Sequence, residues 1–232
     1  MNVLEIIGQI KALPANERAQ VAKSVAEENR KDVLLSTHPP VKVGEVESWL
    51  VEPIQEPEKQ NLIHCIHHRL NNRYIEPLLL IDRTEGGKFR SGFLKMAVAC
   101  LLIEAMQQFH EGKQGTDRKS KEAFKRFFER EKKNNTGFRE LAEDGNYDAF
   151  YDNIRCGIFH QAETKAGYRI LWEGPLFDPL ARTINADEFL EAVKCCLENY
   201  IDVLRKSRTN ETPLKEALEK LRWVCRNCQP AY

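Results

Sequence analysis

An arginine and a histidine stand five residues apart near the end of one segment with a helical pattern. The segment reads Phe150-Tyr-Asp-Asn-Ile-Arg155-Cys-Gly-Ile-Phe-His160. Histidine titrates near neutral pH, so it can take the proton of an RNA 2′-hydroxyl or give one to the leaving oxygen. An arginine fork stays charged and can hold two phosphoryl oxygens while negative charge gathers on them. These residue types therefore suit RNA cleavage without a metal, with His160 as general acid/base and Arg155 as phosphate clamp.

The spacing of the pair constrains its geometry. Five residues at about 100° each place Arg155 and His160 about 140° apart around an ideal helix, so they do not share a tight face. A symmetric dimer would bring two such pairs into one cleft. A plainer interpretation also stands, in which cations near a helix C-terminus simply pair with carboxylates or carbonyls. The neighbours that could support the site are Asn153 or Asp152, which could orient the histidine ring, and Cys156.

The elements that must position this pair are mainly helices. Apolar residues recur at three- or four-residue steps through most of the chain after residue 61, and one short alternating run is typical of a strand. The sequence predicts an all-α bundle with a short β-hairpin insertion. The expected helices span about Leu62–Ile81, Gly92–His110, Lys119–Lys133 and Asn146–Phe159, and the strand spans Tyr168–Trp172. A last long helix is expected after a cap at Asn185 or Asp187, with apolar residues from Phe189 to Leu204 on its inner side.

With this motif and order of elements, residues 62–206 resemble the HEPN superfamily (higher eukaryotes and prokaryotes nucleotide-binding). That family is a helical bundle with an arginine and a histidine four to six residues apart on its later helices. The resemblance implies homodimers and an endoribonuclease of the kind found in bacterial defence or toxin–antitoxin systems, without a cofactor. Many active members carry a polar residue after the arginine, where this chain has Cys156. The alternative is therefore a non-catalytic HEPN-like module that binds RNA, a nucleotide or a protein.

The remaining parts of the chain flank the HEPN-like domain, which we set at residues 61–206. Residues 1–32 are expected to form a helical arm of two short helices, and Ala12-Leu-Pro-Ala-Asn-Glu-Arg18 is similar to the start of small antitoxin-like proteins. Such an arm could contact an antitoxin or another protein partner. Residues 33–60 hold four prolines and are expected to be a connector, with a short extended piece at Val41–Val51. Residues 207–232 are expected to be an amphipathic tail.

A second group of polar side chains lies on the first expected helix. His67, His68, Arg69 and Arg73 could line an RNA groove. His64 and His68 share a helix face, as zinc ligands can, but no further ligands complete a zinc site. The pair Cys225 and Cys228 is likewise too few for structural zinc. No metal site and no cofactor are expected.

Composition bounds the classes of function. Lys and Arg together number 35, as do Asp and Glu, so the net charge is zero and a general basic coat for nucleic acid is disfavoured. The seven cysteines are typical of reduced thiols in the cytoplasm. No signal peptide, membrane-spanning segment or phosphate-binding glycine loop is expected. A cytoplasmic protein with RNA as its partner is the expectation.

Overall fold

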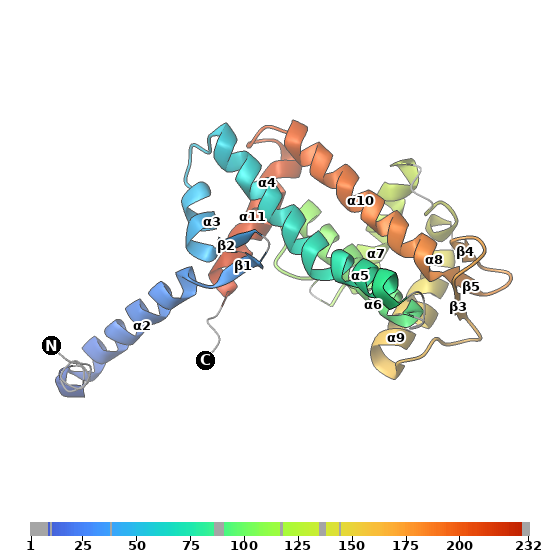
Figure 1. Ribbon diagram of the computed structural model, residues 1–232, viewed down its shortest axis with the longest axis horizontal. Coiled ribbons are helices and arrows are strands. Elements are labelled where there is room, and N and C mark those ends of the chain that lie inside the picture. Colours follow the sequence, from blue (N-terminus) through green and yellow to red (C-terminus); the bar gives the residue numbers. More distant parts are fainter. Residues whose placement is uncertain are drawn as a thin grey trace.

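Helices make up most of the chain that the computed structural model describes, namely residues 9, 11–37, 39–85, 91–116, 118–134, 138–143 and 145–228. The expected fold class, a helical bundle with a small β insertion, is confirmed at this level (Figure 1). The α-helices are α2 (Ala15–Lys31), α3 (Val43–Trp49), α4 (Glu56–Leu70), α5 (Glu76–Glu85), α6 (Gly92–Glu111), α7 (Ser120–Glu131), α8 (Asn146–Ala149), α9 (Cys156–Gln161), α10 (Ala186–Lys206) and α11 (Thr212–Asn227).

Shorter elements connect these helices. Two π-helical turns are η1 (Asn71–Ile75) and η4 (Phe150–Arg155), and two 3₁₀ turns are η2 (Lys132–Asn134) and η3 (Glu140–Ala142). The strands are β1 (Leu34–Thr37), β2 (Pro40–Lys42), β3 (Arg169–Leu171), β4 (Phe177–Asp178) and β5 (Thr183–Asn185).

Helix α6 is the centre of the bundle, as its nearly all-round apolar sequence predicts. It packs against α10, α11 and α7, and it also contacts α9 and β3. It ends at Gly112, whose positive φ of 61° is the left-handed conformation that glycine adopts readily after a helix. One side of this helix reaches the surface, where Phe93, Leu94 and Leu101 are 39%, 47% and 37% exposed.

Helix α6 also has the length and hydropathy to cross a membrane, by those two measures alone. This differs from the expectation that no segment does. In the described chain 56% of its most apolar window is buried inside the molecule, which is the position of a core helix.

The C-terminal helices complete the core. Of the two expected caps, Asn185 is the one that precedes helix α10, and its side-chain oxygen accepts hydrogen bonds from the backbone N–H groups of Asp187 and Glu188. Helix α11 packs on α6, α3 and α10, so the segment expected to be a tail is part of the core. Its buried side is formed by Leu214, Ala217, Leu218, Leu221, Val224 and Cys225.

The expected connector is more structured than its prolines suggest. Strands β1 and β2 form an antiparallel hairpin, and helix α3 begins at Val43. The prediction of an extended piece at Val41–Val51 is therefore wrong for most of its length. Val43 and Val46 are fully buried and Leu50 is buried too, so three- and four-residue spacing makes one apolar face that packs on α4.

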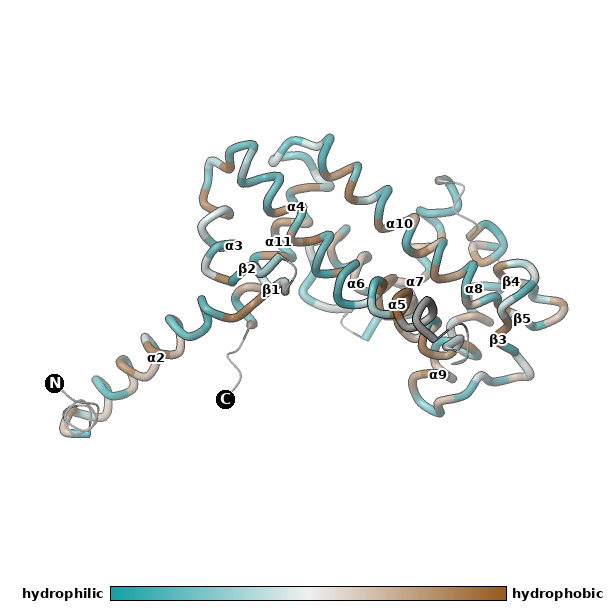
Figure 2. Tube along the Cα trace, viewed as in Figure 1, coloured by the Kyte–Doolittle hydropathy of each residue, from teal (hydrophilic) through white to brown (hydrophobic). Residues whose placement is uncertain are grey.

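The N-terminal arm projects away from the bundle (Figure 1). Helix α2 contacts α3 near the base of the arm. Figure 2 shows hydrophobic positions on α2 as well, although most of this helix is exposed to solvent. The earlier of the two expected arm helices falls largely outside the described residues.

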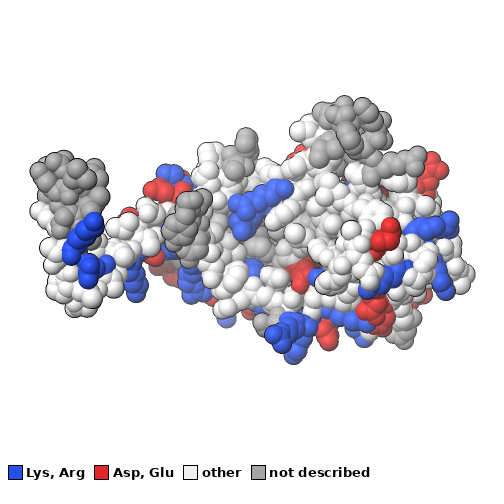
Figure 3. Space-filling model, turned by 90° about the horizontal axis from the view of Figure 1, so that it is seen from below, with Lys and Arg blue, Asp and Glu red and all other residues white. Residues whose placement is uncertain are grey.

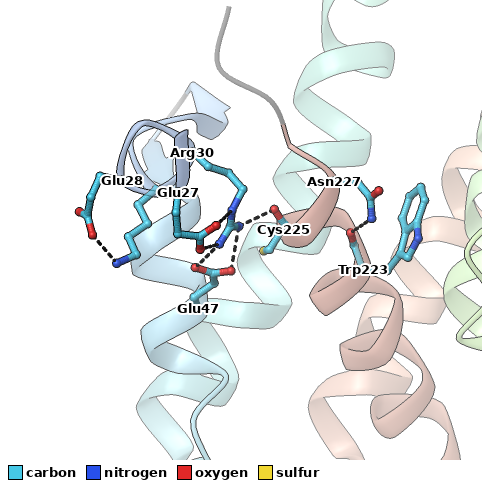
Figure 4. Close-up of polar contacts among 8 residues, drawn as sticks. Glu27, Glu28, Arg30, Glu47, Trp223, Cys225 and Asn227 are labelled. Carbon is cyan, nitrogen blue, oxygen red and sulfur yellow. Dashed lines mark hydrogen bonds and ion pairs between the residues drawn. The ribbon is translucent and has the colours of Figure 1, made fainter. Parts of the chain in front are cut away.

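One buried arginine fixes the arm to the bundle (Figure 4). Arg30, in the last turn of α2, pairs with Glu27 of its own helix and, at 2.9 Å, with Glu47 of α3. Its Nη1 also donates to the backbone oxygen of Cys225, 2.7 Å away near the end of α11. These charge-assisted contacts join three elements that are far apart in the sequence.

The β insertion is a mixed sheet, with strand order β3-β5-β4. Strand β3 runs parallel to β5, and β4 pairs with β5 in the antiparallel sense. The single hairpin expected around Tyr168–Trp172 is therefore wrong in topology. The residues between β3 and β5 make a crossover that the alternating pattern of one strand could not reveal.

Candidate functional site

The Arg155–His160 segment is helical from Asn146 to Gln161, as predicted, but its middle is a π-helix. The backbone N–H of Cys156 donates to the oxygen of Tyr151, five residues earlier. Such π turns insert an extra residue into a helix and are frequent at functional sites. Phe150 is fully buried against Phe124, Phe128 and Phe189, so the aromatic core fixes the start of the π turn.

Arg155 is held by a carboxylate of the central helix. Its Nη2 lies 3.1 Å from Oε2 of Glu104, and the side chains of Arg155 and Glu104 are only 15% and 20% exposed. The guanidinium carbon also lies 5.3 Å from the ring centre of Tyr151 and 4.7 Å from that of Phe159. The buried Nε atom of Arg155 makes no hydrogen bond to the part of the chain that the structure describes. The guanidinium is thus desolvated and fixed, with part of its donor capacity unused.

The electrostatics of this position follow from its neighbours. Burial acts to lower the pKa of Arg155, but Tyr151 and the Glu104 carboxylate outweigh it and leave the pKa above its ordinary value. Glu104 is itself oriented, because the Thr116 hydroxyl donates to its other oxygen at 2.9 Å. Arg155 therefore remains a cation whose position is set by α6.

His160 lies on the next helical turns and is exposed. Within the described residues it forms no hydrogen bond or ion pair, with Arg155 or with any other group. Since Cys156–Gln161 is α-helical, Arg155 and His160 still point in different directions around the helix, as their spacing predicts. One chain therefore presents the two side chains on neighbouring turns without joining them.

The expected supporting residues are placed differently from one another. Asp152 pairs with Lys121 at 2.7 Å, so its carboxylate faces α7 instead of His160. Asn153 contributes a backbone oxygen that accepts from Lys165 N at 2.8 Å. Cys156 is a half-buried free thiol. In the described chain none of these side chains hydrogen-bonds His160, so they do not orient its ring.

Gly157 allows the following loop to cross the motif. A Cβ atom at this position would lie 2.4 Å from the backbone oxygen of Glu163, closer than two such atoms approach. The loop is further tied down by the contact between Lys165 and Asn153. The backbone between Arg155 and His160 is thereby fixed from outside.

Glu104 is the residue that sequence reasoning missed. The signal was one acidic residue in the largely apolar stretch from Phe93 to Met106, which Lys95 also interrupts. A charge on a core helix usually has a buried partner, because an unpaired buried charge is costly. Nothing in the spacing identified that partner as Arg155, 51 residues later.

The second predicted group has structural contacts. His67 Nε2 lies 2.8 Å from Glu198, and the His68 ring contacts Asn72 at 2.9 Å. Arg73 donates to the backbone oxygen of Leu35 at 2.8 Å, and Arg69 reaches the same oxygen at 3.5 Å. These contacts tie α4 and η1 to α10 and the β1–β2 hairpin. The structure does not bring this group to Arg155, and the predicted RNA role gains no support from it.

Charge on the surface is mixed. On the face shown in Figure 3, Lys and Arg side chains stand in separate groups with Asp and Glu between several of them. On α7, Lys121 pairs with Asp148 and Asp152, and Arg126 pairs with Glu111. A local basic cleft is therefore not a feature of this helix. Among the residues that the structure describes, no group of three His, Cys, Asp or Glu side chains could hold a metal ion.

The chain was compared with known protein families, curated proteins and solved structures. No family model matches the chain, and searches of curated proteins and of solved structures return no significant match.

Proposed function

We propose that the chain is a cytoplasmic, metal-independent endoribonuclease of the HEPN type that acts as a homodimer. His160 is the general acid/base and Arg155 holds the scissile phosphate. One observation carries this proposal. Arg155 has a desolvated guanidinium with unused donor capacity, and Glu104 of α6 fixes its position. The exposed His160 lies on the same helical segment as Arg155. Perturbed, preorganised charges of this kind concentrate at functional sites.

The chemistry requires the two residues to act at different distances from the phosphate. His160 needs access to the 2′-hydroxyl or the leaving oxygen, which its exposure provides. Arg155 needs only to meet the non-bridging oxygens where charge develops. Phosphate would share the guanidinium with Glu104 through the remaining N–H groups.

Within one chain Arg155 and His160 do not meet, and a second copy of the chain would place another Arg155–His160 pair beside the first. Exposed apolar side chains lie on elements around Arg155, and a surface of this composition marks protein interfaces. This apolar face consists of Phe93, Leu94 and Leu101 of α6, Phe159 of α9 and Trp172 after β3, which are 37–47% exposed. Isologous pairing through it would bring two Arg155–His160 pairs together.

A non-catalytic binding module is the second candidate, and one contact favours it. The Glu104 carboxylate already neutralises Arg155, and Cys156 offers no strong hydrogen-bond donor beside it. In that case RNA binds without being cut, and His160→Ala leaves the affinity unchanged.

The test is a gel assay of mixed RNA in EDTA with wild type, His160→Ala and the matched control His64→Ala, another exposed histidine. We expect wild type and the control to leave 2′,3′-cyclic phosphate ends, and His160→Ala to be slower by about 100-fold or more. Equal thermal midpoints would show that the fold is intact. Intact RNA with wild-type monomer and dimer, or cleavage unchanged by His160→Ala, overturns the proposal.

A further inference from the structure

A cavity of about 660 Å³ lies where the ends of four helices meet, separate from Arg155 and His160. Its size is that of pockets for small organic ligands. The walls come from the C-terminal parts of α6, α7 and α10 and from the start of α11. The polar and aromatic part of the lining includes His110, Arg130, Glu131, Tyr200, Asp202 and Lys206.

Two buried donors belong to residues that line this cavity and have no acceptor among the described residues. The hydroxyl of Tyr200 forms no hydrogen bond with any residue that the structure describes, although Tyr200 is only 3% exposed. The Nη2 atom of Arg130 is also buried and unbonded. Buried polar groups are nearly always paired, so two orphaned donors on residues that line one cavity call for an acceptor from outside the chain.

The orientation of Arg130 is fixed by its other nitrogens. Nε donates to Glu131 at 2.9 Å, and Nη1 donates to the side-chain oxygen of Gln107 at 2.7 Å. The guanidinium carbon also lies 5.4 Å from the Phe127 ring centre. Nη2 is therefore the donor that this preorganised fork leaves for a ligand.

The aromatic part of the wall is uncharged. The His110 ring lies 3.9 Å from the Tyr200 ring, centre to centre. Burial and the nearby Arg130 lower the pKa of His110 to about 3, so the imidazole is neutral at pH 7. Together with Cys196, Val203 and Pro213, these rings give the cavity an apolar side.

The charges around the cavity favour an anion. The carboxylates of Glu131 and Asp202 are already paired, Asp202 with Arg205 at 2.8 Å. Lys206 forms no ion pair within the part of the chain that the structure describes. Helix α11 begins at the cavity wall with Thr212, and no side chain of the described residues caps its N-terminus. Its N-terminal dipole therefore adds positive potential there.

We propose that this cavity binds a small organic anion. Its oxyanion accepts hydrogen bonds from Tyr200 Oη and Arg130 Nη2, and its apolar body lies against the aromatic and aliphatic wall. A carboxylate and a phosphate monoester both offer this chemistry. The site is independent of the proposed nuclease, because no residue of either site serves the other.

The test uses three probes that share one ring: phenyl phosphate, benzoate and phenol. Each is titrated at millimolar concentration into the isotopically labelled full chain and followed by amide chemical shifts. We expect saturable shifts around Tyr200 and Arg130 with one or both anions, and at least tenfold weaker binding of phenol. The anion that binds with the higher affinity shows whether the natural ligand is a carboxylate or a phosphate monoester. No saturation by either anion, or equal binding of phenol, overturns the proposal.

Tyr200→Phe separates binding from folding. It removes only the orphaned hydroxyl, so the thermal midpoint without ligand should stay equal or rise. Affinity for the preferred anion should fall at least fivefold. Tyr168→Phe, a hydroxyl deletion in the β insertion, should leave affinity unchanged. Unchanged affinity in Tyr200→Phe, or an equal loss in Tyr168→Phe, overturns the assignment, and nuclease activity is unaffected in every variant.

Discussion

Oε2 of Glu104 lies 3.1 Å from Nη2 of Arg155, and this contact joins the central helix to the candidate site. It fixes the guanidinium and also neutralises it. Both partners are largely buried, so the pair is screened less by solvent and salt than surface pairs are. Any phosphate that reaches Arg155 competes with, or shares donors with, this carboxylate.

Glu104→Gln should strengthen RNA binding and weaken the fold. The amide keeps the shape of the carboxylate but frees the charge of Arg155 for phosphate, so we expect RNA affinity to rise about three- to tenfold, on the order of 1 kcal/mol. Without RNA, the uncompensated guanidinium should cost about 2 kcal/mol of unfolding free energy, less than for a fully buried pair.

These changes are read by fluorescence anisotropy with labelled RNA at fixed salt and by urea denaturation. Glu219→Gln, which removes an exposed pair with Arg222, is the matched control and should change neither quantity. Unchanged RNA affinity in Glu104→Gln would show that Arg155 does not meet phosphate.

Gly157→Ala should destabilise the protein, although alanine is the better helix former. The added Cβ would lie 2.4 Å from the Glu163 backbone oxygen, so the loop or the helix must shift. We expect a loss of about 1–3 kcal/mol, typical of overpacking. Gly115→Ala, where a Cβ meets no atom of the described residues within 4 Å, is the control. Thermal denaturation compares them, and equal midpoints would show that the loop yields without cost.

Much of the bundle could be predicted because apolar spacing reports helices directly. Helices α6 and α7 begin and end within about two residues of their expected bounds, and the Asn185 cap of α10 follows from the side-chain chemistry of that residue. The motif segment Asn146–Phe159 was also predicted as a helix. These features depend on local sequence, which a periodicity argument can read.

The rest depends on tertiary contacts. The π turns at Asn71 and Phe150 shift the helix register without a local signal, and β3 pairs with β5 across a crossover. Helix α3 forms in a proline-rich segment because Val43 and Val46 find a buried surface on the bundle. At the site, Arg155 and His160 could be chosen from their chemistry, but Glu104 could not.

Acid should destabilise the protein in two steps. Burial lowers the folded-state pKa of His110 to about 3 from its ordinary 6.5, so the neutral ring contributes stability above pH 6.5 that is lost as pH falls toward 3. Burial of Glu111 acts to raise its pKa, but hydrogen bonds from Arg126, Lys113 and Gln107 outweigh this and lower it to about 2. That stability is present above pH 4.5 and is lost between pH 4.5 and 2.

The expected loss from His110 between pH 6.5 and 4.5 is roughly 2 kcal/mol. Urea denaturation at constant ionic strength and several pH values measures it. His110→Gln should flatten the curve in this range, while leaving the loss below pH 4.5 that belongs to Glu111. A wild-type curve that is flat from pH 6.5 to 4.5 would contradict the buried neutral state of His110.

Leu94→Glu should convert the proposed homodimer to monomer. Leu94 is 47% exposed at the N-terminal end of α6, and Leu101 lies seven residues later on the same helix face. In an isologous dimer each copy would bring one such carboxylate to the interface. Both carboxylates would lose their water, which strongly opposes association. Light scattering after size exclusion measures the mass. RNA cleavage should fall with dimer content if the site is composite.

Leu180→Glu is the matched control. Leu180 is 96% exposed in the loop between β4 and β5, and it is not one of the residues of the apolar face. It introduces the same charge and should leave both mass and cleavage unchanged. A dimer that survives Leu94→Glu would place the interface elsewhere, with the exposed arm helix α2 as the next surface to test. A monomer that still cleaves RNA at the wild-type rate would instead show that one Arg155–His160 pair is sufficient.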